Sequence, residues 1–254
     1  AGDDGKVRGE RVDGWAIVRH RPAAAARCWR VMRCLLQANC TQTQWRIALS
    51  EPYSALLRLK ISHHDLSRWL AAPVPSSSRW SDWRGISGQW RMENGQYLAS
   101  CSDEALDHLL ADCQALLARY PDNRAALKAF LASAQAGNIQ IAAYDRTATH
   151  FVAGSLTYSE SLYDLIAFLA VARGAADFLK GGDEGVALIH DYLWAEEGEQ
   201  ETVAAIGLAG PGESGFLSSA DLDGATEPFE TLVEAMLEAE DDPEFRPRNQ
   251  LDRL

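Results

Sequence analysis

Two histidines in the C-terminal half lie close in sequence to aspartates, and this arrangement could support general acid–base chemistry. His150 and His190 each fall in a run that predicts a β-strand, with Asp145 and Asp191 nearby. If the two strands are neighbours, a histidine–aspartate pair could pass a proton to and from a substrate. Strand alternation would instead turn either His190 or Asp191 outward into solvent. An enzyme with this site is one alternative for the function.

The other catalytic and cofactor motifs are incomplete. Residues 210–215, GPGESG, have the glycine spacing of a dinucleotide-binding loop, but the following FLSSADLDG does not predict the helix that such a site requires. We therefore interpret this segment as a flexible turn. The histidine spacings are not typical of zinc sites, and no Walker loop or nucleophile elbow occurs. The sequence thus predicts neither a metal nor a cofactor.

Residues 79–91, RWSDWRGISGQWR, combine three tryptophans with three arginines. Rings and cations at this density could bind single-stranded nucleic acid through base stacking and phosphate contacts. The surface would be formed by Arg79, Trp80, Trp83 and Arg84. The acidic isoelectric point, about 4.9, argues against it. Nucleic-acid binding is a second alternative.

The same segment leads into a predicted β-hairpin. Asn94-Gly95 suits a type I′ turn, because both residue types tolerate positive φ. A hairpin closed there would place four residues on one face, which is most simply a core face. These residues are Trp90, Met92, Tyr97 and Ala99. The arginines would then point outward, towards the acidic half of the chain.

Charge is distributed unevenly along the chain. Residues 1–100 contain 15 Lys+Arg and 8 Asp+Glu, whereas the remainder contains 9 and 28, which together give the net charge of −12. An anionic surface attracts basic proteins and raises their association rate. The leading hypothesis is therefore a non-catalytic protein of the inhibitor or immunity type, which masks a basic partner protein. The predicted contact residues are Glu196, Glu197, Glu199, Glu201, Glu234 and Glu238.

The periodicity of apolar residues predicts an α+β fold, with a mostly antiparallel sheet built from hairpins, helices packed on one face and a helical N-terminal part. Residues 1–75 form the Arg/Trp-rich helical region, and 76–138 a β-hairpin with a helical hairpin. Residues 139–240 form an acidic ββαββα region, and 241–254 a tail; all four can also make one compact domain. Predicted helices include 23–37, 51–61, 62–72, 102–117, 124–136, 160–179 and 228–240.

Two features bear on location. No run of about 18 apolar residues occurs, and the polar N-terminus has no apolar signal core. The five cysteines are odd in number and scattered, which is typical of free thiols in a reducing compartment. We expect a cytoplasmic protein with no membrane partner.

Overall fold

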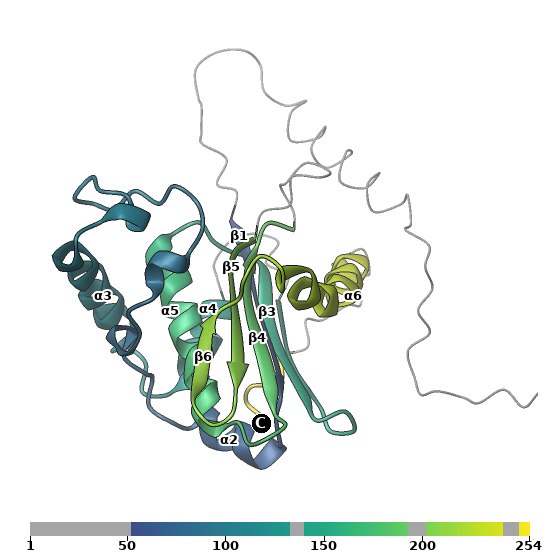
Figure 1. The fold of residues 1–254 in the computed structure, drawn as a ribbon. Coiled ribbons are helices and arrows are strands. Elements are labelled where there is room, and N and C mark those ends of the chain that lie inside the picture. Colours follow the sequence, from purple (N-terminus) through teal and green to yellow (C-terminus); the bar gives the residue numbers. More distant parts are fainter. Residues whose placement is uncertain (1–51, 133–139, 193–201, 241–248) are drawn as a thin grey trace, which may run out of the picture. The chain divides into compact units, whose positions relative to one another are not determined.

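The structure is a computed structural model that describes residues 52–132, 140–192, 202–240 and 249–254, all within the compact unit Ser50–Leu254. Within these ranges the chain has the predicted α+β fold, with an antiparallel six-stranded sheet and five α-helices (Figure 1). The predicted N-terminal helix, residues 23–37, lies outside the described residues.

The sheet has the strand order β2-β3-β1-β4-β5-β6, and every neighbouring pair is antiparallel. The strands pair β2 with β3 and β4 with β5 as consecutive hairpins, and β1 lies between them. Their bounds are β1 Tyr53–Lys60, β2 Gln140–Asp145, β3 His150–Ser159, β4 Glu184–His190, β5 Thr202–Ala209 and β6 Glu213–Phe216.

The prediction of a helix over residues 51–61 was wrong, because this segment is the central strand β1. Leu57 and Leu59 face one side of the sheet and Leu56 the other, and all three are fully buried. A strand covered on both faces reads as a continuous apolar run, whose period cannot distinguish a strand from a buried helix.

Four helices cover one face of the sheet (Figure 1). They are α2 His63–Leu70, α3 Asp103–Leu117, α4 Asn123–Leu131 and α5 Leu162–Arg173. The side chains of Ser62 and Ser102 accept hydrogen bonds from the first turns of α2 and α3, as their sequences predict. Helix α5 is buried along nearly its whole length at the centre of the layer. None of the helices in the described ranges is long and apolar enough to span a membrane.

The last helix, α6 Leu222–Glu240, lies on the opposite face of the sheet (Figure 1). Its buried residues are spaced along one helical stripe: Ala225, Phe229, Val233 and Met236. On the sheet, Leu56 and Leu188 pair with each other and are buried as well. The helix begins six residues before the predicted start, so that Pro228 lies within it.

The hairpin around Asn94-Gly95 forms with a different register from the predicted one. Arg91, not Met92, lies opposite Tyr97, and only Gly95 of the two turn residues has positive φ. The turn is therefore not type I′, and the loop is one residue longer. This shift exposes Tyr97 and Ala99 and buries Leu98, the reverse of the prediction.

The end of the predicted tail is packed against the domain. Leu251 is fully buried, and Asn249 forms a bridge to Ala142 on the edge strand β2. Arg124 donates a hydrogen bond to the Leu251 carbonyl, and Lys128 forms an ion pair with Asp252. Residues 249–254 thus cover part of the β2 edge instead of forming an arm.

Candidate functional site

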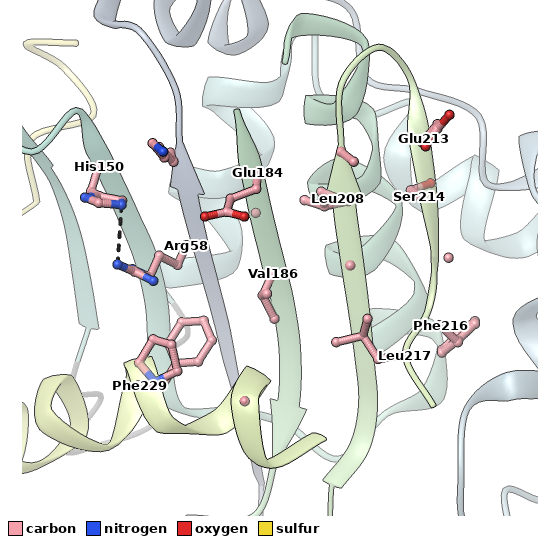
Figure 2. A pocket seen from close by; sticks show the side chains of 17 residues that line it. Arg58, His150, Glu184, Val186, Leu208, Glu213, Ser214, Phe216, Leu217 and Phe229 are labelled. Atoms are coloured by element: carbon pink, nitrogen blue, oxygen red, sulfur yellow. Dashed lines mark hydrogen bonds between the residues drawn. The ribbon is translucent and has the colours of Figure 1, made fainter. Parts of the chain in front are cut away.

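A groove of about 640 Å³ opens on the α6 face of the sheet (Figure 2). Strands β1, β3, β4, β5 and β6 contribute its floor, and the first half of α6 forms one wall. The lining residues that carry its chemistry are Arg58, Lys60, His150, Glu184, Glu213 and Phe229.

Strand alternation places the charged lining residues on this face. His150, Lys60 and Glu184 lie in one row across β3, β1 and β4. The next row inward contains Arg58, Val186 and the facing glycines Gly207 and Gly215. The floor is bare backbone at Gly215 on β6, whereas the side chain of Leu217 lies over Gly207 on β5. The groove therefore joins a charged end to an open floor.

The charged end is organised by Arg58 and His150 (Figure 2). Arg58 Nη2 lies 3.3 Å from His150 Nε2. An arginine can only donate, so Nε2 accepts and the ring is neutral with its proton on Nδ1. Burial, and then the positive charges of Arg58 and Lys60, lower the pKa of His150. The site thus offers two cations, Arg58 and Lys60, beside a neutral imidazole.

The histidine and the hydroxyl that line the groove are both engaged in contacts with arginines. The one hydroxyl among the lining residues belongs to Ser214, whose Oγ accepts a hydrogen bond from Arg173 Nε at 3.1 Å. His150 Nε2, which would act as a base, is occupied by Arg58. Within the described ranges, no three side chains of the His, Cys, Asp and Glu types come together to hold a metal.

The proposed acid–base residues do not converge. His190 lies on the same face as Glu184 but six residues further along β4, while Glu184 is level with His150. At about 3.3 Å per residue, the two histidines are roughly 20 Å apart. Asp145 lies directly opposite His150, but its carboxylate accepts hydrogen bonds from the backbone of the β2–β3 turn.

His190 instead has a buried position of its own. Its Nδ1 lies 2.9 Å from the Thr202 hydroxyl, and its ring centroid lies 4.2 Å from that of Tyr192. Burial lowers the pKa of His190 to about 4, although the adjacent Asp191 opposes this shift. The imidazole is therefore neutral at physiological pH, and its Nε2 has no hydrogen-bond partner among the residues described.

The segment 79–91 is occupied by internal contacts. Trp83 is fully buried and cannot stack on a base. Trp80 is partly buried, and it lies with Trp83 around the guanidinium of Arg173, at 4.7 and 5.2 Å from the ring centroids. Arg79 pairs with Asp177, and Arg84 pairs with Asp103 at 2.8 Å. The residues proposed for nucleic-acid binding are therefore engaged in contacts within the chain.

The acidic residues fall into two groups. Glu196, Glu197, Glu199 and Glu201 lie outside the described residues, as does the side chain of Glu238. Glu234 is exposed on α6 and shares that face with three further exposed acids: Asp223, Glu227 and Glu230. The described part of the predicted acidic surface is thus the outer face of this helix.

Residues 210–212 are the turn between β5 and β6, and residues 213–215 belong to strand β6 instead of opening a helix. This context does not match a dinucleotide-binding loop. Arg58 and Lys60 were missed because β1 was predicted as a helix. The alternation Arg58-Leu59-Lys60 was the available signal.

Comparison of the chain with protein-family models, curated proteins and solved structures finds no match.

Proposed function

We propose that this protein is a non-catalytic inhibitor or immunity-type protein that binds a basic partner protein through the outer face of α6. The observation that carries the proposal is a row of carboxylates at Asp223, Glu227, Glu230 and Glu234. Their spacing of four, three and four residues puts them on one face of the helix. The helix contains no lysine or arginine.

The physical state of this face supports binding. No ion pair joins these four carboxylates to any cation within the described ranges. The opposite stripe of α6 is buried against the sheet, so the carboxylates are presented on a fixed support. Fixed charges of one sign raise the association rate of an oppositely charged protein and reject like-charged competitors.

The proposal includes a cytoplasmic location and no nucleic-acid partner. It is consistent with the free, buried thiols of Cys101 and Cys113 and with the internal use of Arg79, Trp83 and Arg84.

A capture experiment with charge-reversed variants tests the proposal. The full chain is immobilised and exposed to extract of its native cell at low and high salt. We expect a basic protein that is retained at low salt and lost as salt rises. The variant E227K/E230K/E234K should lose this protein.

The control variant E93K/D107K/D112K has the same net charge, and its three positions are exposed away from α6. It should retain the partner. If both variants captured the partner equally, the contact would lie elsewhere on the protein. If both lost it, binding would depend only on the net charge. Either result would reject the role of α6.

A further inference from the structure

We propose that the groove beside α6 binds an organic anion, with its anionic group at Arg58 and Lys60 and its apolar body over Gly215 and against Leu217. This site is separate from the proposed protein contact, because the groove lies against the buried stripe of α6 and the acidic residues are on its outer face.

One end of the groove carries an excess of positive charge. Arg58 is partly buried, yet within the described ranges it forms no ion pair and its side chain makes one hydrogen bond, to His150. A guanidinium has five N–H donors, so most of them are available to an oxyanion. Lys60 lies two residues away on the same face. Carboxylate and phosphate oxygens are the groups that such a site would hold.

The other part of the groove has space for an uncharged part of a ligand. A Cβ atom added at Gly215 would meet nothing within 4 Å, whereas one added at the facing Gly207 would lie 2.8 Å from Leu217 Cδ2, so the open space is over Gly215. Val186, Leu217 and Phe229 provide apolar walls beside this floor (Figure 2). A groove with apolar walls and a few convergent polar groups is typical of small-molecule sites.

Two carboxylates limit the negative charge that a ligand of this groove can carry. Glu184 lies opposite Lys60, and Glu213 lies at the far end of the same row. These two carboxylates offset part of the positive potential and repel a second anionic group. A molecule with a single anionic group and an apolar body fits this pattern best.

The test measures binding to the full chain through the His150 ring signals in NMR titrations. The probes are 6-phenylhexanoate and 6-phenylhexyl phosphate, with acetate, inorganic phosphate and neutral 6-phenylhexan-1-ol as comparisons. Their length suits the three strand spacings between Arg58 and Gly215, which come to about 14 Å. We expect one of the two aryl anions to bind and to raise the pKa of His150, because added negative charge beside Arg58, Lys60, Asp145 and Glu184 favours the imidazolium. The probe that binds more tightly shows whether the site prefers a carboxylate or a phosphate group.

Two variants test the charged end and the open floor of the groove separately. Arg58→Gln should weaken binding about tenfold or more, since charge-assisted hydrogen bonds are lost. Gly215→Leu should block the floor while leaving the fold intact. Arg119→Gln, at an exposed site on the other side of the sheet, should bind as the parent does.

Three outcomes would overturn the proposal: no perturbation by either aryl anion, equal binding of the neutral alcohol, or binding that survives both variants. If acetate or inorganic phosphate bound as tightly as the aryl anions, the apolar part of the groove would contribute nothing to affinity, and the proposal would also be rejected. The acidic face of α6 is unchanged in every variant, so these results are independent of partner capture.

Discussion

The guanidinium of Arg173 donates to both carboxylate oxygens of Asp82, at 2.7 and 3.1 Å. Arg173 lies at the end of α5 with its side chain 1% exposed, whereas the Asp82 side chain is 43% exposed. The same guanidinium donates to Ser214 on β6. One buried cation thus joins the segment 79–91, the central helix and the edge strand, and Trp80 and Trp83 shield it from water.

This relationship predicts that Asp82→Ala is strongly destabilising. Removing the carboxylate leaves a buried guanidinium without its counter-ion, which costs roughly 3 kcal/mol or more of unfolding free energy. The double variant Arg173→Leu/Asp82→Ala should be more stable than Asp82→Ala alone, because the uncompensated charge is gone. Urea unfolding measures both values.

The exposed Lys128–Asp252 pair provides the control. Asp252→Ala should leave the urea midpoint within error, because exposed ion pairs contribute little. A double variant less stable than the Asp82→Ala single would contradict the assignment of the penalty to an unpaired buried charge.

The lowered pKa of His190 predicts that the folded protein loses stability in mild acid. Its pKa is about 4 in the folded chain, whereas an unperturbed histidine, as in the unfolded chain, has a pKa of 6.5. Between these values the unfolded state binds more protons, so stability falls as pH decreases from 6.5 to about 4. The full effect is about 3 kcal/mol. His150, whose pKa is also lowered, adds to it with the same sign.

Unfolding measured by urea at a series of pH values checks this prediction. His190→Leu should flatten the curve in this window. His108→Gln, at an exposed position of α3, controls for the loss of a histidine as such. An unchanged slope in His190→Leu would mean that this imidazole has the same pKa in the folded and unfolded chains, and would contradict the prediction.

Local signals in the sequence predicted several elements correctly. Ser62 and Ser102 mark the starts of α2 and α3 because their hydroxyls cap the first turns. Asp145-Arg146 marks the β2–β3 turn because alternating apolar residues flank it. In both cases the decisive interactions lie within a few residues of each other.

The groove depends on contacts that are distant in sequence. Arg58 meets His150 across 92 positions, because β1 inserts between β3 and β4. The sequences of β3 and β4 carry no local signal that β1 lies between them. The apolar run of β1 also fits a helix equally well. The four-residue β6 is too short to show alternation. A candidate site built from neighbouring strands therefore became visible only in the fold.

An added methyl group at Gly154 is expected to destabilise the folded protein. A Cβ atom there would lie 2.5 Å from the Ala55 carbonyl oxygen and 2.5 Å from Leu56 Cδ2. Gly154→Ala should therefore destabilise the β1–β3 contact by about 1–3 kcal/mol, as overpacking does. Gly181→Ala, where a Cβ meets nothing within 4 Å, should be neutral. Equal thermal midpoints for the two variants would refute the close approach of β3 to β1.

The attachment of α6 depends on Phe229, which is fully buried and also lines the groove. Phe229→Ala should lower the unfolding free energy by about 3–5 kcal/mol through lost burial and a residual cavity. Because this helix contacts the sheet mainly at β4 and β5, hydrogen exchange should accelerate first in α6 and then in those strands. Glu230→Ala, one residue later on the exposed face, should leave both stability and exchange unchanged. If Phe229→Ala left exchange in α6 unchanged, the helix would be held by other contacts, and the wall of the groove would not depend on this ring.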